Sequence, residues 1–374
     1  MVSMILSATV LADAPGQPLL LLGPSLGTSA ETLWARCASR LRGGFHVVGW
    51  DLPGHGRSAP ATSGYTVADL ARAALALADD IRPGEPFHYA GDSLGGAVGL
   101  RLLLDAPDRV LRAALLCTGA RLGEAPAWHE RAALVREKGT ESVVAGSIER
   151  WFGPGFLERQ PSAAEALLGA LRATDPESYA YACEALALFD VRRELPRIEQ
   201  PVLAVAGAHD QPAPVAGLRL IADEVLDGRL VVLDDVAHLA PAELPDGVAA
   251  LLDGHFGDDD GLAVRRAVLG DAHVDRSQAG TTGFTRDFQD YITAYAWGGI
   301  WTRPGLDRRS RSMITLTALV ALGHQEELAM HVRAARTNGL TDDEIKEVLL
   351  QTAVYCGVPA ANTAFRIAQK VLAE

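Results

Sequence analysis

A serine stands where the chain turns sharply from a predicted strand into a predicted helix. Residues 91–95 read Gly-Asp-Ser-Leu-Gly, which fits the pattern G-x-S-x-G with Ser93 in the middle. They follow an apolar strand expected at 87–90 and precede a helical run at 96–104. So tight a turn leaves no space for side chains at its flanks, and it pushes the serine out at the sheet edge over a helix N-terminus. Ser93 is therefore a candidate nucleophile, although a glycine-rich structural turn would show the same five letters.

A base and an acid for this serine follow two later strands. Asp210 ends the run 201–210 and His238 ends the run 230–238, so the order along the chain is Ser, Asp, His. This order, with each residue placed directly after a strand, resembles the α/β-hydrolases. His238 would take the proton of Ser93, and Asp210 would orient the imidazole and stabilise its charged form.

Neighbouring polar residues compete with these candidates. We interpret Asp234, Asp235 and His209 as polar groups of loops, and Asp92 as a carboxylate at a helix N-terminus.

The reaction also needs two backbone N–H groups that point at the developing oxyanion. Leu94, directly after the nucleophile, is one candidate donor. Leu26, in the loop after a strand expected at 19–23, is the other candidate.

Short apolar runs alternate with helical segments over the first two-thirds of the chain. Strands are expected at 19–23, 45–51, 87–90, 113–117, 201–206 and 229–233. The alternation predicts βαβ units and a parallel sheet. Between about 119 and 196 the pattern is helical, which predicts a helical cap over the C-terminal edge of the sheet. The glycine-rich acidic stretch 253–261 predicts a linker, so we expect one domain at 1–256 and another at 257–374.

Composition excludes several classes of partner. The chain has 374 residues, enough for two cores, and a hydrophobic fraction of 48%. A formal net charge of −13 would repel nucleic acid and anionic membranes, so we expect neither as a partner. No apolar run is long enough to span a bilayer, and the start lacks the features of a signal peptide. The cysteines show no paired spacing, which favours reduced thiols and a cytoplasmic protein.

Three short segments of the first domain resemble those of one family. They are Ser-Leu-Gly-Thr at 25–28, Trp-x-x-Arg-Ala at 128–132 and Trp-Phe at 151–152. In these the chain resembles bacterial 3-oxoadipate enol-lactonases, and the likeness runs from about residue 2 to 256.

That resemblance implies a small anionic enol-lactone as substrate. Ser93 would open the ring, the departing enolate would collapse to a ketone, and water would release 3-oxoadipate from the acyl-enzyme. Trp128 and either Arg131 or Arg136 of the cap would bind the substrate and its free carboxylate. The alternative is that these arginines form only a solvated helix face.

The chain beyond residue 257 is predicted to be all-helical. Helices are expected near 262–270, 284–297, 308–322, 325–337, 342–355 and 360–373, with a capping box at Thr341-Asp-Asp-Glu344. Glu327 and His331 lie one helical turn apart on the same face. His324 shares their stripe, but about 10.5 Å of helix separates the two histidines at 1.5 Å per residue, too far for one zinc ion. We therefore expect no metal and no cofactor.

Residues from about 260 to 374 resemble 4-carboxymuconolactone decarboxylases, whose all-helical fold is shared with alkylhydroperoxidase-like proteins. The segments that carry the likeness lie at 301–309 (Trp-x-Arg-Pro-Gly-Leu-Asp-Arg-Arg), 327–333 (Glu-Leu-x-x-His-x-Arg), 343–348 and 354–362. Pro359 stands where a C-x-x-C pair would place the second cysteine after Cys356, which argues against thiol redox chemistry.

A decarboxylation of this kind needs no cofactor, because the lactone carbonyl itself can accept the electrons that departing CO2 leaves. We expect His331, oriented by Glu327, to protonate the ring carbon. Arg303, Arg309 and Arg333 are candidate anchors for a carboxylate, and each is equally open to a structural role.

Taken together, the resemblances imply a bifunctional enzyme of protocatechuate breakdown in the β-ketoadipate pathway. The enol-lactone released by the second domain would be the substrate of the first. One alternative is a broad esterase or haloperoxidase-like hydrolase joined to a non-catalytic helical domain that serves for oligomerisation. The decarboxylase resemblance also implies a homo-oligomer formed through the C-terminal domain.

Overall fold

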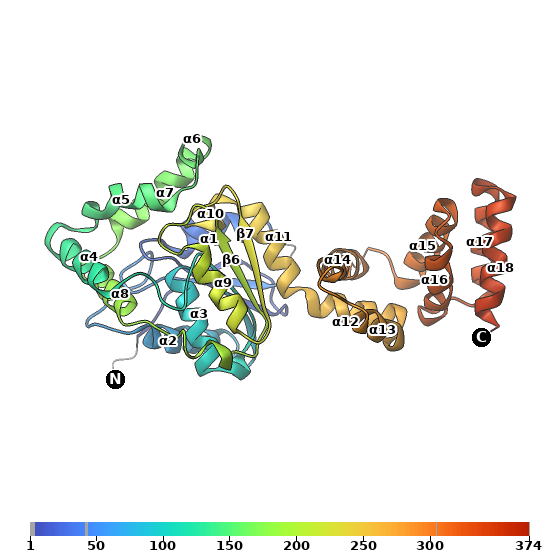
Figure 1. Ribbon diagram of the computed structural model, residues 1–374, viewed down its shortest axis with the longest axis horizontal. Coiled ribbons are helices and arrows are strands. Elements are labelled where there is room, and N and C mark those ends of the chain that lie inside the picture. Colours follow the sequence, from blue (N-terminus) through green and yellow to red (C-terminus); the bar gives the residue numbers. More distant parts are fainter. Residues whose placement is uncertain (1–3, 42–43, 304, 374) are drawn as a thin grey trace. The chain divides into compact units, whose positions relative to one another are not determined.

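The computed structural model describes residues 4–41, 44–303 and 305–373 (Figure 1). Pro304, in the segment 301–309, lies outside the described residues. The chain divides into two compact units, Met1–His255 and Phe256–Glu374. None of the helices within the described residues is long and apolar enough to cross a membrane.

A seven-stranded sheet forms the centre of the first unit, in the order β1-β3-β2-β4-β5-β6-β7. The strands are β1 Ala8–Ala12, β2 Leu19–Gly23, β3 His46–Trp50, β4 Phe87–Asp92, β5 Val110–Leu116, β6 Val202–Gly207 and β7 Gly228–Leu233. β1 pairs antiparallel with β3, and every other neighbouring pair is parallel. The α/β fold predicted from the alternating pattern is thereby confirmed, and the β1 strand at the sheet edge is an addition to it.

Helices of the first unit lie on either side of this sheet (Figure 1). They are α1 Ala30–Ala38, α2 Val67–Ile81, α3 Leu94–Asp105, α9 Val215–Glu224, α10 Ala240–Glu243 and α11 Pro245–Phe256. Ser29 and Thr66 begin α1 and α2 with capping boxes, which satisfy N–H groups that a helix start leaves unpaired. The inner strands β2, β4 and β6 are buried along their whole length, as strands covered on both faces must be.

The segment between β5 and β6 is entirely helical, apart from its connecting turns. Its helices are α4 Ala125–Lys138, α5 Val144–Trp151, α6 Phe156–Arg159, α7 Pro161–Ala173 and α8 Pro176–Ala187, with short 3-10 turns at Pro107–Arg109, Thr140–Val143 and Leu195–Arg197 beside or within it. α4 packs along α8. A Cβ built on Gly27, in the loop after β2, would meet Leu171 and Trp151 of this segment at 2.7 and 3.2 Å. The cap therefore lies directly on a loop at the C-terminal edge of the sheet.

The second unit is all-helical. Its helices are α12 Asp258–Leu269, α13 Asp271–Ala279, α14 Arg286–Ile292, the π-helix η4 Thr293–Trp301, α15 Arg308–Leu322, α16 Gln325–Thr337, α17 Asp342–Cys356 and α18 Val358–Leu372. Leu316, Val332, Ile345 and Leu349 are fully buried in the main core, which α15 to α18 build together. The capping box predicted at Thr341 is confirmed.

The structure differs from two expectations for this region in detail. The stretch 253–261 is not an open linker, because α11 runs to Phe256 and α12 begins at Asp258, with only Gly257 between them. The helical run expected at 284–297 is split into α14 and the π-helix η4.

Candidate functional site

Ser93 occupies the sharp turn between β4 and α3. Its φ of 54° and ψ of −113° lie outside the regions that L-residues ordinarily adopt. The surrounding chain holds this geometry, because the Ser93 N–H donates to the Leu116 carbonyl at 2.9 Å and the Ser93 carbonyl accepts from the Thr118 hydroxyl at 2.7 Å. A strained backbone that neighbours over-determine in this way is typical of a functional turn.

The two glycines of the turn are required by contact. A Cβ on Gly91 would lie 2.3 Å from the backbone of Gly95, and a Cβ on Gly95 would lie 2.5 Å from the backbone of Gly23. The turn and the end of β2 are thus packed backbone against backbone.

Ser93, His238 and Asp210 form a continuous hydrogen-bonded chain. His238 Nε2 lies 2.9 Å from Ser93 Oγ, and His238 Nδ1 lies 2.9 Å from each carboxylate oxygen of Asp210. All three residues are buried, and Asp210 also accepts the Ala213 N–H at 2.9 Å. The geometry is that of a nucleophile, a base and an orienting acid. The structure therefore brings together all three residues singled out from the order along the chain.

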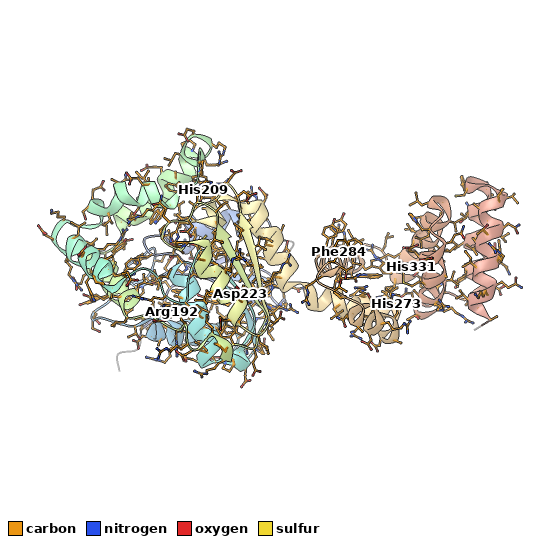
Figure 2. The ribbon with its side chains drawn as sticks, in the orientation of Figure 1. Arg192, His209, Asp223, His273, Phe284 and His331 are labelled. Carbon is orange, nitrogen blue, oxygen red and sulfur yellow. The ribbon has the colours of Figure 1, made fainter. Side chains whose placement is uncertain are left out.

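The residues that competed for these roles lie elsewhere. Asp234, Asp235 and His209 are exposed, and Figure 2 shows His209 within the first unit. Asp92 ends β4, directly before the start of α3. It is buried, and within the described residues its oxygens have no hydrogen-bond partner. Burial, with Asp210 and Glu243 nearby, raises the pKa of Asp92 well above its usual value.

The two candidate oxyanion donors belong to segments fixed side by side. Leu94 is the first residue of α3, so its N–H has no partner within the helix. Leu26 lies in the loop after β2, and the Gly95 N–H donates to the Pro24 carbonyl of this loop at 2.9 Å. A donor from each segment can therefore face the same substrate oxygen.

Glu243 ties the histidine loop to the cap, and sequence reasoning missed it. Its carboxylate accepts the N–H groups of Ala237 and Leu239, on either side of His238, at 3.0 and 3.3 Å. It also accepts the Gly153 N–H of the cap at 2.6 Å. Burial raises the pKa of Glu243 to about 7, against the opposing effect of these hydrogen bonds. Nothing in the sequence separates this glutamate from a surface one.

The two cap arginines differ in their partners. Arg131 donates to the Tyr179 hydroxyl at 2.8 Å and to the Ser147 hydroxyl at 3.3 Å, both neutral groups. Arg136 is instead ion-paired with Glu177 at 3.0 Å and Glu184 at 2.5 Å. Arg131 therefore keeps a charge to offer a ligand, whereas that of Arg136 is neutralised within the cap.

Trp128 is half-buried at the start of the cap. Its indole N–H donates to the Leu122 carbonyl at 2.5 Å, within the connection between β5 and α4. This bond orients the ring, and it leaves the ring faces to make apolar contacts.

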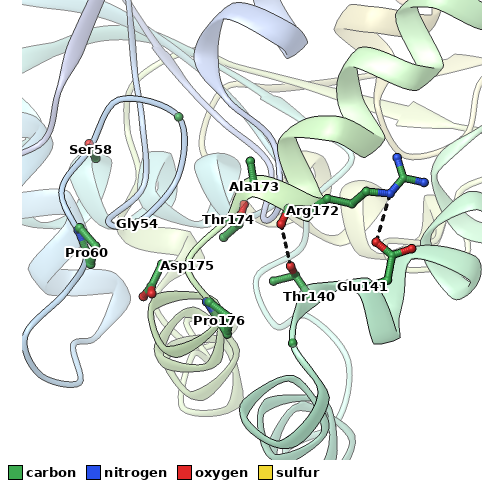
Figure 3. Close-up of a pocket in the computed structure, with 12 residues that line it drawn as sticks. Gly54, Ser58, Pro60, Thr140, Glu141, Arg172, Ala173, Thr174, Asp175 and Pro176 are labelled. Atoms are coloured by element: carbon green, nitrogen blue, oxygen red, sulfur yellow. Dashed lines mark hydrogen bonds and ion pairs between the residues drawn. The ribbon is translucent and has the colours of Figure 1, made fainter.

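A separate open pocket of about 670 Å³ lies between the loop 54–60 and the cap (Figure 3). Arg172 crosses one side of it, ion-paired with Glu141 at 3.1 Å, and the Thr140 hydroxyl donates to the Arg172 carbonyl at 3.1 Å. None of the three residues of the Ser93 chain lines this pocket. Its arginine already has a counter-charge, so the pocket offers no comparable chemistry.

In the second unit, His331 lies on α16 and is half-buried (Figure 2). Burial and the neighbouring His273 lower the pKa of His331 to about 4, while the carboxylate of Glu327 acts in the opposite direction. The imidazole of His331 is therefore neutral at pH 7. Glu327 itself is exposed, at the first turn of α16.

The candidate arginines of this unit are dispersed. Arg309 is engaged with the Gly339 carbonyl and the Glu344 carboxylate, so it joins α15 to α17 and is not available as an anchor. Arg303 is exposed after η4, and its carbonyl accepts from Arg311 at 2.8 Å. Only Arg333 is placed near the imidazoles, where its charge contributes to lowering the pKa of His273.

No group of three or more His, Cys, Asp or Glu side chains that could hold a metal ion occurs among the described residues. Cys37, Cys117 and Cys183 are buried free thiols, and Cys356 is a half-buried free thiol.

Comparison with known proteins assigns relatives to each unit separately. Residues 18–156 match the alpha/beta hydrolase fold family, and residues 286–370 match the carboxymuconolactone decarboxylase family. The chain is 35% identical to 3-oxoadipate enol-lactonase 2 of Acinetobacter baylyi over 229 residues, 61% of this chain and 85% of that protein. It is 47% identical to 4-carboxymuconolactone decarboxylase of the same organism over 114 residues, 30% of this chain and 85% of that protein.

A solved structure supports the first of these likenesses. The enol-lactonase from Burkholderia xenovorans LB400 superposes with a TM-score of 0.64 at 32% identity, covering 67% of this chain and 96% of that chain.

Proposed function

Because the chain belongs to the α/β-hydrolase family through its first unit and to the carboxymuconolactone decarboxylase family through its second, we propose that it catalyses two consecutive reactions. The second unit decarboxylates 4-carboxymuconolactone to 3-oxoadipate enol-lactone. The first unit hydrolyses that lactone to 3-oxoadipate. The observation that carries the proposal is the fusion itself: one chain joins a homologue of an enol-lactonase to a homologue of a carboxymuconolactone decarboxylase.

In the lactone hydrolysis, Ser93 Oγ attacks the ring carbonyl while His238 Nε2 takes its proton. The N–H groups of Leu26 and Leu94 stabilise the oxyanion, and Asp210 stabilises the imidazolium. The enolate leaving group departs and takes up the proton that His238 holds, which returns the imidazole to its neutral form, and conversion of the leaving group to a ketone makes the acylation favourable. Water, activated by His238, then releases the dicarboxylate product from Ser93.

A side-chain carboxylate of the lactone needs a cation that is not already neutralised. Arg131 meets this requirement, since its partners Tyr179 and Ser147 are neutral, whereas Arg136 does not. We therefore assign the carboxylate to Arg131, with Trp128 as an apolar neighbour of the bound ring.

In the decarboxylation, departing CO2 leaves its electron pair behind, and the pair flows through the ring double bond into the lactone carbonyl. His331 then delivers a proton to the ring carbon next to that carbonyl, which moves the double bond to the position it has in the enol-lactone. Its imidazole is neutral in the free protein, so the proton arrives with substrate binding. The negative charge of a bound carboxylate raises the pKa of an adjacent imidazole and makes it a competent acid.

The second unit also supports self-association. It exposes many large apolar side chains, among them Phe284, which is 96% exposed, and Tyr355, which is 79% exposed. Isolated exposed apolar residues are common, but a concentration of them marks an interaction surface. We propose that the chain forms a homo-oligomer through this unit.

The alternative is an esterase or haloperoxidase-like hydrolase whose helical unit is silent. One experiment distinguishes the proposed function from this alternative. The full chain is given the carboxylated lactone and the enol-lactone in turn, and CO2 release and ring opening are measured independently. The proposal expects CO2 from the carboxylated lactone and ring opening of the enol-lactone. Hydrolysis of simple esters with no CO2 release would support the alternative.

A further inference from the structure

Arg265, in α12, is a buried cation with neutral partners. The residue is only 6% exposed. Nη1 donates to the Thr293 hydroxyl at 3.2 Å. Nη2 donates to the Ser277 hydroxyl and to the side-chain amide oxygen of Gln289, each at 3.0 Å. These partners come from three different elements, η4, α13 and α14, so the guanidinium sits where the helices converge.

This guanidinium lacks a counter-charge within the part of the chain that the structure describes. No carboxylate there forms an ion pair with it, and its buried Nε–H has no hydrogen-bond partner. The next residue, Arg266, is ion-paired with Asp271 at 3.2 Å and Asp275 at 2.7 Å. A buried, unpaired charge is costly, and an anion that occupies the site would relieve the cost.

Near Arg265 the backbones of α12 and η4 lie in close contact. A Cβ on Gly261, one turn before Arg265, would lie 2.6 Å from the Thr293 carbonyl and 3.1 Å from the Gly298 N–H nitrogen. α12 therefore packs directly on η4, the element that supplies the Thr293 hydroxyl. A π-helix is rare and is frequently found at functional sites.

Arg265 and His331 flank the same small buried core of the second unit. Val268 and Ala334, one turn from Arg265 and from His331, share a small buried core with Trp297. His273, on α13, has a pKa lowered by burial and by the charges of Arg265, Arg276 and Arg333. Figure 2 shows His273 and His331 within the second unit, and the pKa of His331 is lowered by His273.

We propose that Arg265 binds a carboxylate of the substrate in the second unit, with the imidazole of His273 beside it. The ligand is a small organic carboxylate. Its charge would balance that of the guanidinium, and its oxygens would accept hydrogen bonds from the Nε–H and Nη groups. This inference rests on the proposed decarboxylation for its substrate. It also identifies a carboxylate anchor different from Arg303, Arg309 and Arg333.

The test compares Arg265→Met with Arg266→Met in the full chain. Loss of a charge-assisted hydrogen bond should raise the KM for the carboxylated lactone about 10- to 100-fold in Arg265→Met and leave it unchanged in Arg266→Met. Because no carboxylate of the described residues pairs with the buried charge, the thermal midpoint of Arg265→Met should stay level or rise. A folded Arg265→Met protein with wild-type KM, or one that simply loses stability at unchanged KM, would overturn the inference.

A non-reacting probe separates this inference from the proposed function. Succinate should raise the thermal midpoint of the wild type, neutral succinamide should not, and Arg265→Met should abolish the succinate effect. If Arg265→Met does not fold, a crystal structure of the wild type with succinate decides, since a carboxylate is expected on Arg265 Nε. Succinate found only elsewhere would refute the site. Arg265-dependent succinate binding without decarboxylation would instead leave the site standing and refute the proposed reaction.

Discussion

The carboxylate of Glu243 accepts a 2.6 Å hydrogen bond from the backbone N–H of Gly153, and this contact joins the cap to the loop of His238. The connection is doubled, because the His238 N–H donates to the Trp151 carbonyl at 3.2 Å. The cap and the loop of His238 are therefore held together by two hydrogen bonds.

Replacing Glu243 should disturb the position of His238 without touching the reacting atoms. A glutamine offers an NH2 group where the carboxylate accepts N–H donors, so at least one of the contacts to Gly153 or Ala237 is lost. We expect Glu243→Gln to lower kcat for lactone hydrolysis about 10- to 100-fold, the effect of a small misplacement. The control is Glu224→Gln, an exposed residue at the end of α9, which should have wild-type kinetics.

The raised pKa of Glu243 also predicts a pH dependence of stability. The folded state holds the Glu243 proton up to about pH 7, whereas the unfolded chain releases it near its ordinary value of 4.5. The folded state binds more protons in this window, so the group's contribution to stability decreases as the pH rises from about 4.5 to about 7 and is constant above that. Denaturant unfolding of the wild type and Glu243→Gln at several pH values measures the difference. A difference that grows with pH across the window would contradict the assignment.

The two cap arginines should respond in opposite ways to neutralisation. Arg131→Gln removes a charge with neutral partners, so the KM for the enol-lactone should rise about 10- to 100-fold while the fold is retained. Arg136→Gln leaves Glu177 and Glu184 without their cation, so its cost should fall on stability, with little change in KM. Steady-state kinetics and thermal midpoints of both variants test this pair. The reverse pattern would move the substrate carboxylate to Arg136.

Replacing His331 should affect the decarboxylase alone. Positioned acid catalysis contributes roughly 10²- to 10⁴-fold, so His331→Ala should lower the decarboxylase kcat by about that factor and leave lactone hydrolysis unchanged. Glu327→Gln should lose less, because Glu327 is exposed and acts on the imidazole only through its charge. A folded His331→Ala protein that decarboxylates at the wild-type rate would exclude His331 as the acid.

Separating the chain at Gly257 should give two folded proteins, because each unit has its own core. The piece 1–257 should retain lactone hydrolysis at the rate of the full chain. The piece 258–374 should be an oligomer by light scattering coupled to size exclusion. A monomeric second piece would remove the argument from its exposed apolar side chains.

The hydrogen-bonded chain of Ser93, His238 and Asp210 was predictable because its elements carry strong local signals. Gly91 and Gly95 are required by the turn itself. Asp210 follows the buried strand β6 and His238 follows β7, so order along the chain was enough to select them. β1 carried no such signal, since it is a short edge strand whose only buried residue is the polar Thr9. α13 was missed for the same reason, because Val274 is the single buried residue in an otherwise polar stretch.

Residues that act through long-range contacts could not be found in this way. Arg265 and Arg266 are neighbours of the same type. Only the packing of four helical elements leaves the first without a carboxylate among the described residues and pairs the second with two. Glu243 is recognisable only by its contact with Gly153, ninety positions away in the chain. Arg309 shows the converse, because a motif position proved to hold α15 to α17 through Glu344.

The assignment of the two reactions to two separate sites is tested most directly with the full-length Ser93→Ala protein. The protein is supplied with the carboxylated lactone, and CO2 and 3-oxoadipate are both measured. We predict CO2 release at the wild-type rate and accumulation of the enol-lactone. Formation of 3-oxoadipate should be lowered roughly 10⁴-fold or more, because the nucleophile is gone while the second site is untouched. Rapid 3-oxoadipate formation by this variant, beyond the spontaneous hydrolysis of the lactone, would contradict the role of Ser93. Loss of CO2 release together with ring opening would contradict the assignment of the two reactions to separate units.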